Sequence, residues 1–183
     1  MKVLKWVAIT GGLLLAALVL FGLFASRDYA LARTIVIDAP PEKVHELIGD
    51  LTRWPEWAPW EEDDPSIETT LGDKSVGVGA SQTWTSDSGD GRLEITASDA
   101  AAGIEYTMAF VEGETEMPAD CKMSYNVKDG KTELVWEMEG SIDVAFLGPL
   151  MAVGMDSMVG PMFDDGLEKL KALAEGTATP ADE

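Results

Sequence analysis

The sequence has very little cysteine and histidine. Its 183 residues include a single cysteine, Cys121, and a single histidine, His45. One cysteine cannot form an internal disulfide framework, and these two residues are too few for a typical zinc site. The chain also lacks a phosphate-binding loop, a nucleophile elbow and a dinucleotide fingerprint. We therefore expect no metal ion and no cofactor, and we expect His45 to be a solvated side chain rather than a general base.

Basic residues are scarce as well. The chain has 13 Lys and Arg against 33 Asp and Glu, which gives a formal net charge of −20. A surface this acidic repels nucleic acid and anionic lipid headgroups, so we expect no nucleic-acid partner. The rest of the composition, with 46% hydrophobic residues, six Trp and nine Met, is typical of a chain that folds around a core.

Charged side chains are absent from residues 6–26 near the N-terminus. At about 1.5 Å per residue this run reaches roughly 30 Å, the thickness of the hydrocarbon core of a bilayer. It has no polar face, so it predicts one transmembrane helix. Lys2 and Lys5 precede the run, and the positive-inside tendency then favours a domain on the extracytoplasmic, periplasmic side.

A cleaved signal peptide is the alternative interpretation of this N-terminal segment. Lys2 and Lys5 would form its basic region, and Ala30, Leu31 and Ala32 fit the small-residue cleavage pattern. Cleavage near Ala32 would make the protein secreted rather than a single-pass membrane protein.

The remainder of the chain has the size of one domain. We expect residues 1–32 to form the anchor and a short link, residues 33–175 to form the domain, and residues 176–183 to form a disordered tail. Near the start of the domain, the β-branched run 33–38 predicts a strand and the amphipathic segment 41–51 predicts a short helix.

One more short helix, a series of strands and one long helix account for the rest of the domain. Residues 53–60, with three Trp and two Pro, favour a short turn-like helix. From Ser66 onward, alternation with glycine and acidic turns indicates an antiparallel meander, with strands at 79–86, 92–98, 104–110, 121–128 and 134–139. An apolar stripe then predicts a helix over 150–175, with a possible bend at its glycines and Pro161, and with Gly176 as its end.

Four short segments carry a family resemblance. Residues 35–44, 47–51 and 54–57 resemble the opening strand, helix and tryptophan signature of the START-like superfamily, also called SRPBCC, in its polyketide cyclase/dehydrase branch. Residues 163–171 resemble its terminal helix. The resemblance covers residues 33–175 and implies an α+β helix-grip (START/Bet v 1-like) fold. In that fold a curved antiparallel sheet wraps a long C-terminal helix, and two short helices follow the first strand.

The resemblance also implies where a ligand would bind, because ligands of this family occupy an apolar tunnel between the sheet and the long helix. Alternation along the strands and the stripe on the helix select the side chains that would line it. They are Trp84, Tyr106, Met108, Phe110, Tyr125, Trp136, Met138, Met155, Met158, Met162 and Phe163. A lining rich in methionine adapts its shape to many ligands. The alternative is that the same side chains simply fill the core.

Three functions are consistent with these patterns. The first is a membrane-tethered binding or carrier domain for an apolar small molecule of the lipid, quinone or isoprenoid type. The second is a cyclase or dehydratase, for which Tyr106, Tyr125 and Asp156 are the candidate acid or base residues. The third is a ligand-free interaction module that uses an exposed patch of Trp54, Trp57 and Trp60.

Overall fold

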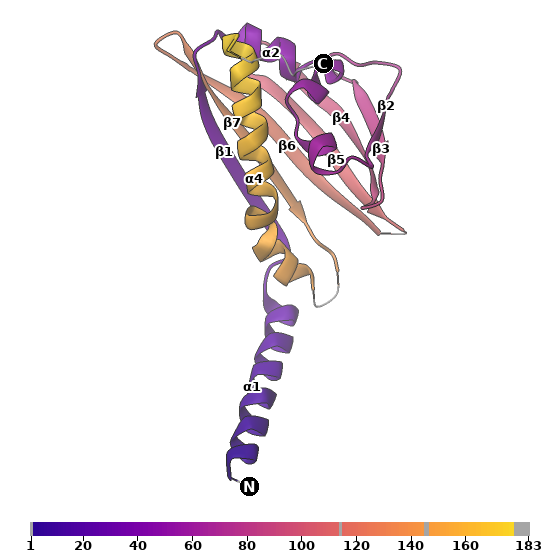
Figure 1. Ribbon diagram of the computed structural model, residues 1–183, viewed down its shortest axis with the longest axis vertical. Coiled ribbons are helices and arrows are strands. Elements are labelled where there is room, and N and C mark those ends of the chain that lie inside the picture. Colours follow the sequence, from indigo (N-terminus) through magenta and orange to yellow (C-terminus); the bar gives the residue numbers. More distant parts are fainter. Residues whose placement is uncertain (1, 114, 145–146, 178–183) are drawn as a thin grey trace.

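The computed structural model describes residues 2–113, 115–144 and 147–177, and it shows one curved sheet wrapped around one long helix (Figure 1). The seven strands are all antiparallel to their neighbours, in the order β1-β7-β6-β5-β4-β3-β2. Their bounds are β1 Asp28–Ile37, β2 Glu68–Leu71, β3 Ser81–Thr85, β4 Asp90–Asp99, β5 Gly103–Glu112, β6 Thr115–Lys128 and β7 Lys131–Ser141. The predicted α+β helix-grip architecture is therefore confirmed, apart from its transmembrane helix.

The sheet has one face against the core and one face toward solvent. Along β7, Leu134, Trp136 and Met138 are buried, while Glu137 and Glu139 between and after them are exposed. This is the alternation that a half-buried antiparallel strand requires. A hairpin turn joins β6 to β7, with Asp129 and Gly130 at φ 55° and 79°, the left-handed conformations that a tight two-residue hairpin needs.

The long helix α4 (Gly148–Glu175) lies over β1 and β7, at one side of the concave face. It is one continuous helix, with its glycines and Pro161 inside it. Arg33 on β1 fastens it to the sheet, since its guanidinium donates to Asp156 at 2.8 Å and to Asp164 at 3.2 Å. Gly160 lies where the Arg33 guanidinium passes the helix, and a larger side chain there would collide with it.

The helix ends as expected. Gly176 adopts φ 70°, and its N–H donates to the carbonyl of Leu173 at 3.1 Å. The predicted tail lies outside the described residues from residue 178 onward.

The first strand starts at Asp28 rather than at residue 33. Residues 28–32 pair with β7, from Asp28 opposite Ser141 to Ala32 opposite Glu137, and Leu31 is buried. Alanine has little intrinsic preference for strands, so the pairing with β7 decides the conformation of this segment and local sequence does not. The link between the N-terminal helix and the sheet is therefore shorter than predicted.

Three short helices close one end of the sheet: α2 (Pro41–Ile48), the 3-10 helix η1 (Leu51–Glu56) and α3 (Trp60–Asp63). The indole N–H groups of Trp54 and Trp57 donate to the carbonyls of Ile48 and Leu47, at 2.9 and 3.3 Å. These carbonyls at the end of α2 have no partner within the helix, so the indoles satisfy them. Trp54 and Trp57 are buried, and the predicted exposed tryptophan patch is wrong.

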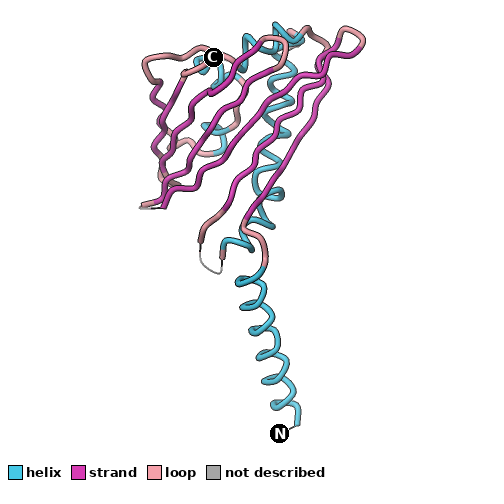
Figure 2. Tube along the Cα trace, turned by 180° about the vertical axis from the view of Figure 1, so that it is seen from behind, coloured by secondary structure: helices cyan, strands magenta, loops and turns pink. Residues whose placement is uncertain are grey.

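Residues 2–24 form the helix α1 (Lys2–Phe24), which projects from the end of the domain where α4 begins (Figures 1 and 2). Within the described part of the chain, no helix combines the length and apolar content needed to cross a bilayer. The predicted membrane span is thus not confirmed. Leu14, Leu15 and Ala17, in the middle of that predicted span, are outside the described side chains.

Candidate functional site

A cavity of about 490 Å³ lies against the inner face of the sheet. It exists because α4 covers the β1 and β7 side of the concave face, while the side formed by β3, β4 and β5 has no long helix packed on it. The walls come from the sheet, from one side of α4, and from η1, α3 and the loops beside them. A volume in this range accommodates a small organic molecule.

Most of the cavity wall is apolar, and methionine and aromatic side chains dominate it. Tyr106, Met108 and Phe110 point into it because alternate residues of β5 share one face. The apolar members of the wall are Trp54, Trp60, Ile67, Trp84, Leu93, Tyr106, Met108, Phe110, Val111, Met117, Met138, Met158, Val159, Met162 and Phe163.

The structure brings together most of the side chains that the sequence selected. Those on the wall are Trp84, Tyr106, Met108, Phe110, Met138, Met158, Met162 and Phe163. Tyr125, Trp136 and Met155 do not line the cavity. Sequence reasoning missed Trp54 and Trp60, which it assigned to an exposed patch, and Val159, which lies on the same side of α4 as Met162.

Trp136 belongs to the core rather than to the cavity. Its ring is fully buried and stacks on Phe163 with a centroid distance of 3.8 Å and an interplanar angle of 10°. Trp57 and Trp60 meet it edge-on, at 5.6 and 6.0 Å. This aromatic cluster packs beside the cavity, so Trp136 fills the core, as the alternative interpretation predicted.

The wall also carries the neutral polar side chains Thr69, Gln82, Ser86, Ser88 and Tyr106. The Tyr106 hydroxyl accepts a hydrogen bond from the Trp136 indole N–H at 2.9 Å, and burial raises the pKa of Tyr106 well above its usual value. Tyr106 therefore stays a neutral phenol and cannot act as a base at neutral pH. Gln82, which is 9% exposed, adds a side-chain amide that can donate and accept hydrogen bonds.

Three aspartates, Asp63, Asp64 and Asp90, contribute to the cavity lining, and no Lys or Arg is among its described lining residues. Hydrogen bonds from the hydroxyl and backbone N–H of Ser66 lower the pKa of Asp64, which keeps its carboxylate ionised. The cavity therefore offers neutral polar groups and negative charge, but no cationic side chain among its described lining residues to pair with an anion.

Tyr125 instead belongs to a polar cluster with the only histidine. His45 on α2 places Nδ1 3.3 Å from the Tyr125 hydroxyl and Nε2 3.1 Å from the Ser98 hydroxyl. Partial burial lowers the pKa of His45, although the carboxylate of Asp99 opposes that shift. The expectation that His45 is simply solvated is wrong, because the cluster joins α2 to strands β4 and β6.

The candidate catalytic residues are not brought together. Tyr106 is on the cavity wall, Tyr125 is bonded to His45, and Asp156 is exposed and paired with Arg33. Asp156 therefore points toward β1 and not into the cavity, so these three residues do not form an acid–base site.

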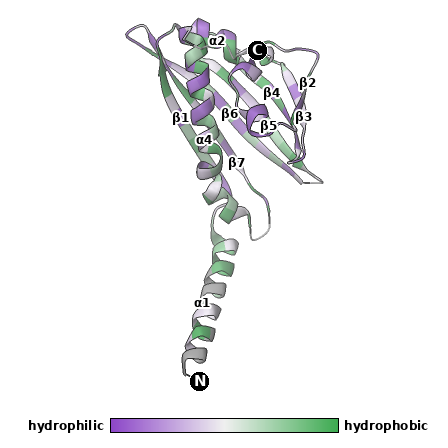
Figure 3. Ribbon diagram, viewed as in Figure 1, coloured by the Kyte–Doolittle hydropathy of each residue, from purple (hydrophilic) through white to green (hydrophobic). Residues whose placement is uncertain are grey.

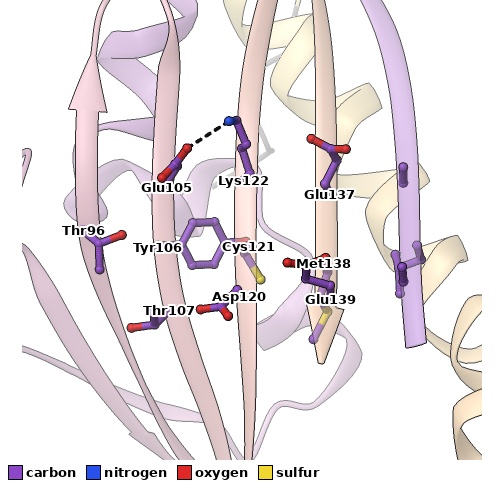
Figure 4. Close-up of a pocket in the computed structure, with 13 residues that line it drawn as sticks. Thr96, Glu105, Tyr106, Thr107, Asp120, Cys121, Lys122, Glu137, Met138 and Glu139 are labelled. Carbon is purple, nitrogen blue, oxygen red and sulfur yellow. Dashed lines mark ion pairs between the residues drawn. The ribbon is translucent and has the colours of Figure 1, made fainter. Parts of the chain in front are cut away.

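A second hollow of about 490 Å³ lies on the outer face of the sheet (Figure 4). Outward-pointing side chains border it, including Glu105, Asp120, Glu137 and Glu139, and Lys122 pairs with Glu105 at 2.9 Å. The residues described contain no group of three or more His, Cys, Asp or Glu that could hold a metal ion. This hollow is the solvated acidic face of the sheet.

Comparison with known proteins agrees with this architecture. Residues 30–175 match the family model described as polyketide cyclase/dehydrase and lipid transport. No curated protein matches the chain.

Solved structures share the fold at low sequence identity. Protein CV1439 from Chromobacterium violaceum is 16% identical with a TM-score of 0.59, covering 80% of this chain and 96% of that one. Protein MLL2253 from Mesorhizobium loti is 19% identical with a TM-score of 0.59, covering 82% and 99%. Ara h 8.0201 is 16% identical with a TM-score of 0.52, covering 78% and 97%. The family match extends over most of the chain, and the predicted resemblance is confirmed: this protein belongs to the polyketide cyclase/dehydrase and lipid transport family.

Proposed function

We propose that this protein binds and carries an apolar small molecule in the cavity between the sheet and α4, while α1 tethers it to a membrane. The observation that supports the binding role is the cavity itself, about 490 Å³ in volume and lined largely by methionine and aromatic side chains. Methionine side chains adapt to irregular apolar shapes, which suits a flexible hydrocarbon chain. The family description includes lipid transport, which agrees with such a ligand.

The charges around the cavity narrow the ligand class. A fatty-acid anion would bring its carboxylate toward Asp63, Asp64 and Asp90 with no cation beside it among the described lining residues. Burying an unpaired charge is strongly unfavourable. Gln82 and Tyr106 instead suit a carbonyl or hydroxyl oxygen, so a neutral lipid of the quinone or isoprenoid type fits best.

The membrane tether is proposed on the properties of α1 and its neighbours. Residues 6–26 carry no charge, and Leu13, Leu18 and Phe24 of α1 are 67%, 58% and 82% exposed. A helix that exposes such residues in water is unfavourable, and an acyl environment would cover them. Lys2 and Lys5, in the first turns of α1 and before its uncharged run, favour a domain on the extracytoplasmic side.

An uncleaved tether is favoured over a signal peptide by the place of the candidate cleavage site. Ala30, Leu31 and Ala32 lie inside β1 and pair with β7. Cleavage after Ala32 would remove the part of β1 that begins at Asp28, together with the buried Leu31. The intact mass of the protein isolated from membranes tests this directly, since the full-length mass is expected and a mass beginning at Arg33 would refute the tether.

The binding proposal is tested by filling the cavity from one strand. Met108 points inward on β5, and its neighbour Thr107 is exposed on the outer face. Met108→Trp is expected to abolish binding of decylubiquinone, measured by native mass spectrometry of the full chain in a nonionic detergent. Thr107→Trp adds the same side chain to the other face and should bind like the wild type. Absence of the bound mass in the wild type, or equal binding by Met108→Trp, would refute the proposal.

A further inference from the structure

The first two turns of α4 are exposed and apolar. Leu147 at the start of the helix is 56% exposed, Leu150 is 53% exposed and Val153 is 70% exposed. No charged residue occurs in the sequence between Asp143 and Asp156. Scattered exposed apolar residues are ordinary, but a contiguous group without charge marks a surface that contacts something apolar.

This surface lies beside the point where α1 leaves the domain (Figure 3). Three contacts hold it there. Arg27, just after α1, forms an ion pair with Asp143. Its backbone carbonyl accepts a hydrogen bond from the N–H of Ile142 at 3.0 Å. A Cβ on Gly148 would lie 3.4 Å from the Arg27 side chain, so the first turn of α4 packs on the link.

The distance from α1 to the sheet is very short. Only residues 25–27 separate the end of α1 at Phe24 from the start of β1 at Asp28. Even fully extended, three residues reach about 10 Å. With α1 in a bilayer, the first turns of α4 therefore lie at the depth of the headgroups.

We propose that the first two turns of α4, from Leu147 to Val153, dock into the surface of the bilayer that holds α1. This inference rests on the proposed membrane tether. The occupant is the acyl and headgroup boundary of a zwitterionic lipid surface, because the chain carries a net charge of −20 and the cation Arg27, where the link meets α4, is already paired with Asp143. Amphipathic helices that lie in the membrane interface bury their apolar face about 5–10 Å into that boundary.

Docking at this place has a consequence for the cavity. Met158, one to two turns further along α4, is 66% exposed and also belongs to the cavity wall. The docked turns and part of the cavity wall therefore belong to the same helix, so docking would bring this side of the cavity close to the bilayer surface.

The single buried cysteine makes the test selective. Cys121 is 4% exposed, so an introduced surface cysteine takes an NBD fluorophore preferentially. Full-length protein carrying Val153→Cys, Leu18→Cys or Val127→Cys is reconstituted in phosphatidylcholine vesicles with or without doxyl-labelled phosphatidylcholine. Leu18 on α1 reports the tether. Val127 is 53% exposed near the β6–β7 hairpin, at the opposite end of the domain, and is the control.

We expect doxyl lipid to reduce the fluorescence at Leu18→Cys and Val153→Cys at least about twofold and to leave Val127→Cys unchanged, as insertion to acyl depth requires. Adding Leu150→Asp should restore the fluorescence at Val153→Cys. Quenching at Leu18→Cys alone would overturn the docking while the tether stands. No quenching at Leu18→Cys would refute the tether and the docking with it. A blue shift at Val153→Cys without quenching would indicate burial against a second copy of the chain and would also overturn the docking.

Discussion

At the scale of single residues, Gly91 controls how much room the cavity has. It lies opposite Trp84 on the paired strands β3 and β4, and a Cβ on Gly91 would collide with the Trp84 ring. The ring, 5.7 Å from Phe110 between centroids, lies over the glycine because no side chain is there. Gly91 therefore keeps a cavity-lining aromatic ring flat against the sheet.

Gly91→Ala is accordingly expected to push Trp84 into the cavity and to weaken decylubiquinone binding about tenfold or more, since about 1.4 kcal/mol of steric cost corresponds to tenfold. Quenching of tryptophan fluorescence by the quinone measures the affinity. Arg92→Ala on the outer face of the same strand is the control and should bind normally. Unchanged binding by Gly91→Ala would mean that Trp84 does not limit the cavity.

A second prediction at this scale concerns how His45 makes the stability of the fold depend on pH. Partial burial lowers the pKa of His45 in the folded chain below the ordinary value of 6.5. As the pH falls, His45 therefore takes up its proton in the unfolded chain before it does so in the folded chain. The stability that neutral His45 contributes to the fold is complete above pH 6.5 and is lost as the pH falls toward the folded pKa. Chemical denaturation between pH 7.5 and about 5 measures the loss.

His45→Gln is expected to flatten that part of the pH profile, because the amide does not titrate in this range. An equally steep profile in the variant would assign the loss to carboxylates rather than to His45. Ser98→Ala and Tyr125→Phe remove one partner each and keep the titrating ring, so both should retain a slope.

At the scale of elements, α4 continues through a proline that ordinarily disrupts a helix. Pro161 is exposed within α4, between the cavity residues Met158 and Met162. A proline in a helix interior costs about 3 kcal/mol relative to alanine, and its restriction of the unfolded chain returns up to about 1 kcal/mol.

Pro161→Ala is therefore expected to raise the free energy of unfolding by about 2 kcal/mol. Urea denaturation of the full chain in a nonionic detergent measures the change. Glu168→Ala is the control, because Glu168 is an exposed residue of the same helix and is not a proline. It should change the free energy of unfolding by less than about 0.5 kcal/mol. A destabilised Pro161→Ala variant would show that the native helix needs the proline, for example to position Met158 and Met162 in the cavity wall.

The elements also show what the sequence can and cannot predict. Alternation correctly assigned Met108 and Phe110 to the inner face of β5, because side-chain direction follows from the strand period alone. It also assigned Tyr125 and Trp136 to the inner face, but it carries no information about the neighbours of each residue along that face. Tyr125 meets His45 and Trp136 meets Phe163, and these contacts depend on how α2 and α4 pack.

Two strand predictions failed for a similar reason. Residues 28–32 have no strong local preference for a strand and become one only through pairing with β7. The short edge strand β2 was not predicted at all, and it forms by pairing with β3. Tertiary partners, which a single sequence does not show, determined both cases.

At the scale of the whole molecule, negative charge is the dominant feature. The net charge of −20 is spread over a surface that includes the acidic outer face of the sheet in Figure 4. Like charges held together in a folded chain repel one another and oppose compaction. Salt shortens the range of this repulsion, from about 30 Å at 0.01 M to about 8 Å at 0.15 M.

Raising NaCl from about 0.01 M to 0.15 M is therefore expected to raise the Tm by a few degrees, equivalent to about 1 kcal/mol for a chain of this size. Thermal unfolding in a nonionic detergent measures it, and KCl should act equally if the effect is screening. A Tm that is insensitive to salt would show that the charges are too far apart to repel.

The three-residue link between α1 and β1 has a further consequence for how a ligand would be delivered. With α1 in a bilayer, the domain cannot leave the membrane, and its search for cargo or for an acceptor becomes lateral diffusion in two dimensions. Such a molecule would exchange its ligand within one membrane rather than shuttle it between membranes. Any transfer across an aqueous gap would then need a second, mobile carrier.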